Sequence, residues 1–166
     1  MNKSDKSIHN ICIAAIKRST MQPYEFEWTK FYDSNSVFTD SYPNIPIDLW
    51  ENELVICSTV IDSNNFSILT TQKLITKENG ALNSETLVGA IDKSYGDFKG
   101  YKSGSSTFGI VQLQNGKDLN YFIEIGKASM IMIHGVRTII KSESMTDKQA
   151  NNVAKIWNRR THNEQQ

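Results

Sequence analysis

The chain has 166 residues, 39% of them hydrophobic and 22% charged, a composition typical of a globular protein. A chain of this length buries roughly two-thirds of its unfolded surface, so it needs neither a metal nor a disulfide to fold as one domain. Eighteen basic residues balance eighteen acidic ones, and this zero net charge argues against a general nucleic-acid-binding protein, which usually carries a basic excess.

Targeting signals are not evident in the sequence. The first ten residues are polar, with no hydrophobic region after them that is typical of a signal peptide. The longest hydrophobic run, residues 130–140, is interrupted by His134, Gly135 and Arg137 and is too short to span a membrane. We therefore expect a cytoplasmic protein, in which Cys12 and Cys57 are free buried thiols rather than a disulfide.

An amphipathic helix is predicted at the N-terminus, within residues 1–20. Ser4 or Ser7 can cap it, and Lys17 and Arg18 suit its C-terminal end. Five hydrophobic positions recur with helical spacing on one face: Ile8, Ile11, Cys12, Ala15 and Ile16. The mixed charge of the opposite face favours a helix that docks on a sheet over one that lies on a membrane.

Residues 21–52 form a segment that is both acidic and aromatic. The stretch 20–50 contains all three prolines and eight of the sixteen aromatic residues. From Glu25 to Glu53 there are seven acidic residues and one lysine, a local net charge of −6. Alternation at residues 24–28 predicts a short strand, and the remainder predicts an irregular loop. Whether this segment packs on the core or extends from it stays open.

A run of short strands follows. We predict strands at 53–62, 66–71, 73–77, 86–92, 107–114 and 118–125, with 98–102 as a further candidate. Asn115–Gly116 is a strong hairpin signal, and Gly89 is interpreted as a bulge. Six or seven strands without an intervening helix predict an α+β protein whose antiparallel sheet closes into a barrel or folds into a sandwich.

The C-terminal part changes to a helical period. Residues 130–140 fit a helix better than a last buried strand, although Gly135 costs a helix about 1 kcal/mol relative to alanine. A clearer helix is predicted at 146–160, because Thr146 and Gln149 form a capping box. Residues 161–166 are predicted to be a polar tail, so the β core with its closing helix extends over 53–141 of a single 1–166 domain.

The stretch I68-L-T-T-Q-K-L-I75 has a hydrophobic pair, a threonine, a basic residue and a second hydrophobic pair. Together with F122-I-E-I-G-K-A-S-M-I-M-I-H-G-V-R-T-I139, it resembles bacterial pleckstrin-homology-like domains over residues 50–141. The resemblance implies a β core closed by a helix, used as a non-enzymatic scaffold that binds phosphoinositides, peptides or protein surfaces. It does not select a ligand.

Motifs for enzymatic chemistry are absent from the sequence. There is no Walker A, dinucleotide-binding, zinc-protease or nucleophile-elbow motif, and the glycines at 100–107 are interpreted as a flexible turn. His9, His134 and His162 are far apart, so we expect no metal and no cofactor. Cys57 and His134 are the one nucleophile–base pair considered, against the simpler interpretation of a core thiol and a structural histidine.

Basic residues are also scattered. Lys93, Lys99 and Lys102 are a candidate lipid-headgroup loop, but Asp92 and Asp97 dilute them and favour a solvated turn. The basic stretch at 155–160 fits a helix C-terminus and needs no ligand.

The acidic segment is therefore the most informative candidate site. One interpretation is a loop whose aromatics pack inward while its acids face water. The sharper hypothesis is a surface for a basic protein partner, most concretely an immunity-type inhibitor that binds a toxin domain. The alternatives are a membrane- or lipid-associated adaptor and, last, an enzyme with a dispersed site. The predicted protein-binding residues are Glu25, Glu27, Trp28, Asp33, Asp40, Tyr42, Asp48, Trp50, Glu51 and Glu53.

Overall fold

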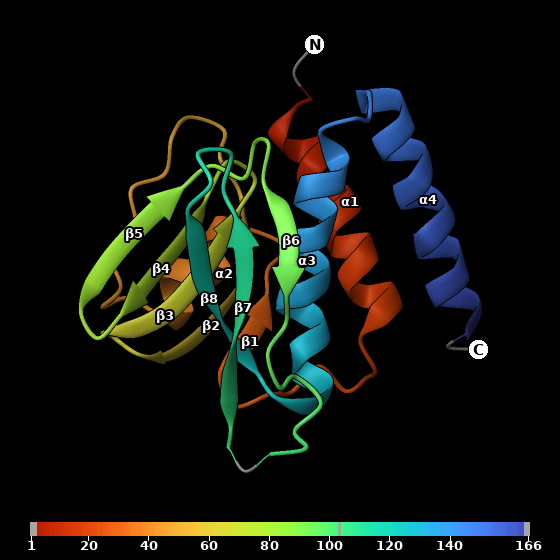
Figure 1. Ribbon diagram of the computed structural model, residues 1–166. Helices are drawn as coiled ribbons and strands as arrows, with labels where there is room; N and C mark the ends of the chain where they lie inside the picture. The colour runs from red at the N-terminus through yellow and green to blue at the C-terminus, as the bar shows by residue number, and fades with distance from the viewer. Residues whose placement is uncertain (1–2, 103, 165–166) are drawn as a thin grey trace.

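Two antiparallel sheets and four α-helices make up the computed structural model, which describes residues 3–102 and 104–164 (Figure 1). The first sheet has the order β1-β2-β3-β4-β5 and the second the order β6-β7-β8. The strands are β1 (Thr29–Phe31), β2 (Val55–Asp62), β3 (Asn65–Thr70), β4 (Leu74–Glu78), β5 (Ala81–Glu85), β6 (Ile91–Ser94), β7 (Ser106–Gln112) and β8 (Asp118–Glu124). The helices are α1 (Asp5–Ser19), α2 (Asn35–Ser41), α3 (Ser129–Ser142) and α4 (Asp147–Glu164), with a short 3-10 turn η1 (Gly126–Ala128) before α3.

The α+β class is confirmed, but the sheets are open, so the prediction of a closed barrel is wrong. The chain leaves β5 through residues 86–90, which are in no strand, and β5 and β6 each lie at the edge of their own sheet. Where β3 and β8 approach each other, the Phe122 backbone N–H donates to the Ser67 hydroxyl at 2.8 Å. This bond links the two sheets through a side chain, because the backbone of β3 already pairs with β2 and β4.

Helix termini follow the capping signals of the sequence. Ser4 caps α1, its hydroxyl accepting from the Ser7 backbone N–H at 3.2 Å. At α4, the Gln149 side chain accepts from Thr146 N–H at 2.9 Å and the Thr146 hydroxyl accepts from Gln149 N–H at 3.2 Å, which confirms the capping box. Residues 130–140 are helical in α3, as predicted. The helix α4 extends to Glu164, beyond the predicted end at residue 160, and the last two residues of the predicted tail lie outside the described part.

Several strand predictions were wrong for local reasons. No strand forms at 24–28 or 98–102; in the latter, Asp97 instead accepts the backbone N–H groups of Tyr101 and Lys102. Gly89 lies in a loop at φ +72°, not in a bulge. Strand β5 was missed because all five of its residues are exposed, so no hydrophobic alternation marks it. Within the segment 21–52, helix α2 replaces part of the predicted loop.

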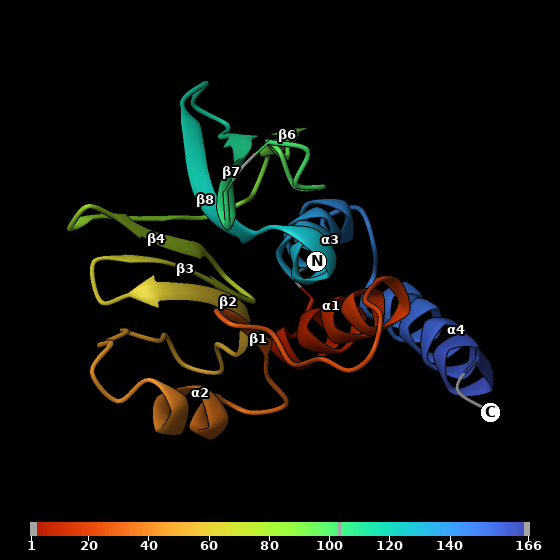
Figure 2. The ribbon, with the colours of Figure 1, turned by 90° about the horizontal axis from the view of Figure 1, so that it is seen from below.

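The five-stranded sheet is covered on both faces. On one face, Cys57 and Leu69 join a core with α1 and α3, in which Ile11, Ile16 and Ile131 are fully buried. On the other face lies a second core made by the sheet and the segment around α2: Tyr32, Phe38, Ile45, Val55, Val60, Phe66, Ile68 and Ile75. Figure 2 shows α2 apart from the other three helices, on a different side of the strands.

Two fully buried tyrosines differ in the state of their hydroxyls. The Tyr32 hydroxyl shares a 2.7 Å hydrogen bond with the Ser58 hydroxyl, whereas the Tyr121 hydroxyl has no partner among the described residues. A buried polar group costs desolvation free energy unless a hydrogen bond compensates it.

We therefore expect opposite effects from the same substitution. Tyr121→Phe should leave the free energy of unfolding unchanged or raise it by up to about 1 kcal/mol, because an unpartnered hydroxyl is removed. Tyr32→Phe should lower it by about 1–2 kcal/mol, because Ser58 loses its partner. Urea denaturation measures both, and a loss above 1 kcal/mol for Tyr121→Phe would contradict the assignment of its hydroxyl.

Candidate protein-binding surface

The acidic aromatic segment packs on the sheet rather than extending from it. Tyr32, Phe38 and Ile45 are buried against the outer face, and the Tyr32 and Phe38 rings meet edge to face at 5.4 Å. Asn35, in the first turn of α2, fastens that helix to β2. Its side-chain N–H donates to the Glu53 carbonyl at 2.9 Å, and its oxygen accepts from the Val55 N–H at 2.8 Å.

A carboxylate from the second sheet holds the start of this segment. Glu124, the last residue of β8, accepts from the backbone N–H of Trp28 at 2.7 Å and of Glu27 at 3.3 Å. It also accepts from the Thr29 hydroxyl at 3.0 Å, and Thr29 in turn bonds the Thr59 hydroxyl. No sequence pattern indicates this role of Glu124, because its partners are two backbone N–H groups and a hydroxyl almost a hundred residues earlier in the chain.

A buried ion pair holds the end of the segment. The Glu53 carboxylate is 3.0 Å from the Lys73 ammonium, and the exposed fractions of the two side chains are 0% and 7%. Glu53 also accepts from the Trp50 N–H at 2.8 Å and from the Thr70 hydroxyl, and Lys73 donates to the Asp48 carbonyl at 2.8 Å. These hydrogen bonds satisfy both charges, as a buried pair requires.

Glu53 is therefore not part of the exposed acidic surface, although its sequence position predicted that it was. The distinction was invisible in the sequence, since its partner Lys73 lies twenty residues later. The remaining predicted residues are accessible to different degrees. Trp28 and Tyr42 are half-buried, while seven are exposed: Glu25, Glu27, Asp33, Asp40, Asp48, Trp50 and Glu51.

The structure does not gather these acids at one point but distributes them along the anchored segment. Glu25 and Glu27 lie near the Glu124 anchor. Asp33 precedes α2, and Asp40 lies in the last turn of that helix. Asp48 and Glu51 lie on either side of Trp50 in the chain, near the Glu53 anchor. The one lysine of the segment, Lys30, lies 5.3 Å from the centre of the Tyr42 ring. The result is an acidic stretch of surface, called the acidic face below, with aromatic side chains between the charges along the chain.

Trp50 borders the larger of two grooves beside this face. Trp50 is 59% exposed, and the Lys73 ammonium lies 4.1 Å from the centre of its ring, so a cation–π contact helps to hold the ring in place. Across the groove of about 800 Å³ lie Leu87 and the exposed Val88. Asp5 and Gln72 also line it and are hydrogen-bonded to each other. An exposed aromatic beside a groove is a typical anchor position for a protein partner.

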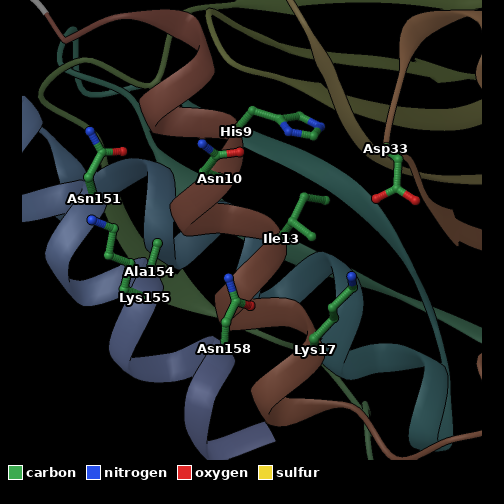
Figure 3. A pocket seen from close by; sticks show the side chains of 9 residues that line it. All are labelled: His9, Asn10, Ile13, Lys17, Asp33, Asn151, Ala154, Lys155 and Asn158. Carbon is green, nitrogen blue, oxygen red and sulfur yellow. The ribbon is translucent and has the colours of Figure 1, made fainter. Parts of the chain in front are cut away.

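Asp33 borders the second groove, of about 550 Å³, which α1 and α4 also line. Figure 3 shows Lys17 of α1 extending toward the side where Asp33 lies, with Asn151, Lys155 and Asn158 coming from α4. His9 is buried here, and its Nε2 lies 2.9 Å from the Tyr32 carbonyl, so this nitrogen donates. Burial lowers the pKa of His9, although the carbonyl opposes the shift, and the groove is therefore lined by a neutral imidazole.

The one nucleophile–base pair considered from the sequence lacks an accessible thiol. Cys57 and Cys12 are free and fully buried, as predicted, and burial raises the pKa of both thiols. The Cys57 sulfur lies 4.0 Å from the Ile131 carbonyl, within the core. A protonated thiol without solvent access is a poor nucleophile.

Within residues 3–102 and 104–164, no three His, Cys, Asp or Glu side chains are grouped so that they could hold a metal ion. For His162, the third histidine of the sequence, the structure describes the backbone but not the side chain. None of the helices described has the length and hydrophobicity needed to cross a membrane.

Comparison with known proteins adds no relative. A scan against protein-family models, a search of curated proteins and a search of solved structures find no match to this chain. The function of the chain is therefore inferred from its own residues and their geometry.

The ion pair that anchors the segment gives a direct test of its packing. Lys73→Met should lower the free energy of unfolding by about 3–5 kcal/mol, because it leaves the Glu53 carboxylate buried without a cation. Adding Glu53→Gln should recover part of this loss, since a neutral amide is easier to bury. Urea denaturation of both variants measures the difference.

Lys77→Met is the matched control, because Lys77 lies on β4, four residues after Lys73, and forms no ion pair with a described carboxylate. It should change stability by less than about 0.5 kcal/mol. If Lys73→Met lowered the free energy of unfolding as little as the control does, the Lys73 ammonium would not be needed to bury the Glu53 carboxylate.

Proposed function

We propose that this chain is a non-catalytic cytoplasmic binding protein that presents its acidic aromatic segment to a basic protein partner. The most concrete version is an immunity-type inhibitor that covers a basic toxin domain. The observation that carries the proposal is the anchoring of the segment at both ends, by Glu124 and by the Glu53–Lys73 pair. A face that is fixed before binding loses less conformational entropy when a partner docks.

Charge and chemistry support the same proposal. Six exposed carboxylates against one lysine give a field that attracts a basic partner and speeds its approach. Trp50, Tyr42 and Trp28 lie among them and are the residue types that contribute most binding energy at interfaces. An acidic rim around partly exposed aromatics fits a partner with arginine and lysine side chains.

The order of the elements supports a pleckstrin-homology-like scaffold for this function. The strands β2 to β5 follow one another as neighbours in one sheet, β6 to β8 in the other, and α3 follows β8 directly. This order of elements agrees with the β core and closing helix that the resemblance over residues 50–141 implies. Helices α1 and α4 and the acidic segment are additions to it.

The same scaffold makes a lipid-associated adaptor the second candidate. The lysines at 93–102 are poorly suited to bind a lipid headgroup. The Lys93 ammonium is already 2.7 Å from the Asp118 carboxylate, and Asp97 lies among the other lysines. Sedimentation with anionic vesicles at low salt tests this candidate. If residues 93–102 hold a lipid headgroup, Lys99→Gln/Lys102→Gln should abolish sedimentation.

The test of the proposed function is association with a captured partner. The tagged chain should retain one basic protein from native-host lysate at low salt, in near-stoichiometric amount, and release it at high salt. With that partner, Asp40→Lys/Asp48→Lys should slow association at least about tenfold at low salt and much less at high salt.

The control is Glu78→Lys/Glu85→Lys, which makes the same change of charge on β4 and β5. All four acids are exposed, and none has a side-chain hydrogen bond to a described residue. Equal slowing by both pairs of substitutions would show an effect of net charge alone and would reject the acidic segment as the interface.

A further inference from the structure

A third cavity, of about 360 Å³, lies where α1, α3 and α4 meet, and its lining is basic. We call it the basic pocket. The residues that define it are Arg18 of α1, His134, Arg137, Thr138 and Lys141 of α3, and Trp157 of α4. None of its lining residues is a carboxylate.

Helical spacing explains how α3 supplies three of these groups. His134, Arg137 and Lys141 follow one another at intervals of three and four residues, which places them on one face of the helix. At about 1.5 Å per residue, they extend along roughly 10 Å of the pocket. Arg18 joins them from α1, with its guanidinium 5.1 Å from the centre of the Trp157 ring.

The three cations of the pocket are poorly compensated. Arg137 is 3.8 Å from Asp92, a weak contact, and Asp92 also accepts from the Tyr95 hydroxyl. Among the described residues, neither Arg18 nor Lys141 forms an ion pair with a carboxylate. The C-terminal turns of α1 and α3 favour Arg18 and Lys141 singly, but this does not explain Arg137 or why the three cations line one cavity.

The pKa of His134 is sensitive to the positive charges that line the pocket. Its pKa is lowered to about 4, first by burial and then by Arg137, Lys141 and Arg18. Its ring is therefore neutral near pH 7, and neither ring nitrogen bonds a described residue. One N–H of a neutral imidazole is then available to an acceptor inside the cavity.

We propose that the basic pocket binds a phosphate group, carried by a soluble phosphate ester or by a phospholipid headgroup. Two guanidinium groups and an ammonium, one of them partly offset by Asp92, can neutralise the negative charge of a phosphate, and guanidinium forks donate to its oxygens in pairs. The Thr138 hydroxyl donates to the His134 carbonyl at 2.6 Å, so its proton is already used within α3 and the cations carry the recognition. This inference is independent of the acidic segment and its protein partner.

Inorganic phosphate is the first probe, added to the full chain in an NMR titration at constant ionic strength set with chloride. Saturable shifts are expected for the Arg137 and Lys141 amides and the Trp157 indole. The pKa of His134 should rise above about 4, because a bound anion offsets the cations that lower it. Shifts that grow without saturation, or an unchanged His134 pKa, would overturn the proposal.

Two pairs of substitutions make the test specific. Arg137→Gln/Lys141→Gln should weaken phosphate binding at least about tenfold, since each charge-assisted contact contributes on the order of a tenfold factor. Lys17→Gln/Lys155→Gln removes the same charge from α1 and α4 in the neighbouring groove and should leave the affinity unchanged. An equal loss of phosphate affinity in both double variants would show that the basic pocket is not the phosphate site. If circular dichroism shows that the first pair does not fold, Arg18→Gln and Lys141→Gln are measured singly.

Two further probes distinguish the source of the phosphate. Glycerol phosphate represents a soluble ester, and vesicles of phosphatidylcholine with phosphatidylglycerol represent a headgroup, against pure phosphatidylcholine vesicles. Binding of either probe that is lost in Arg137→Gln/Lys141→Gln supports the pocket and identifies its source. Vesicle binding that persists in this variant, with no binding of glycerol phosphate, would reject it.

Discussion

The buried carboxylate of Glu53 is the constraint on which the outer half of the molecule depends. Glu53 lies between the acidic segment and β2, which begins two residues later. Its charge is balanced by Lys73 in the β3–β4 turn. Burying a carboxylate is costly unless every lone pair is satisfied, and here a backbone N–H, a hydroxyl and an ammonium converge on it. The same ammonium holds the Asp48 carbonyl and stacks on Trp50. A polar cluster of this kind specifies one arrangement of the loop, where hydrophobic packing alone would permit several.

This arrangement explains why the five-stranded sheet has almost no solvent-facing surface in its middle strands. Six consecutive residues of β2 and five of β3 are buried, so neither strand shows a clean alternation of hydrophobic and polar residues. Serines and threonines occupy several of these positions and bond one another across the sheet, as Ser67 does with Thr76. Their hydroxyls also reach β8, which joins the two sheets. The polar side chains inside the strands therefore hold the layers together.

The sequence predicted those elements whose signals are local. The α1 periodicity, the Thr146–Gln149 capping box and the Asn115–Gly116 hairpin need only neighbouring residues, and each is present. The errors fall where the deciding contact is distant or the strand faces solvent. Strand β5 has no buried residue to mark it, and α2 depends on Asn35 reaching Glu53 and Val55. For the candidate surface, the acidic composition of the segment was predictable. The burial of Glu53 was not, and neither were the convergence of Arg18 with α3 or the role of Glu124.

A net charge of zero describes the chain but conceals how its charges are separated. The acidic segment carries six exposed carboxylates along its length, while Arg18, Arg137 and Lys141 line one pocket with Trp157 of α4. The charges of Glu53 and Lys73 are buried and cancel each other, so they contribute to neither surface. With this separation, the proposed basic partner and the proposed anionic ligand would be drawn to different parts of the molecule. Their fields need not compete, since the Debye length at physiological salt is about 8 Å and screens one surface from the other. Charge balance in the sequence is thus compatible with two opposite electrostatic surfaces, each defined by where the fold places a few side chains.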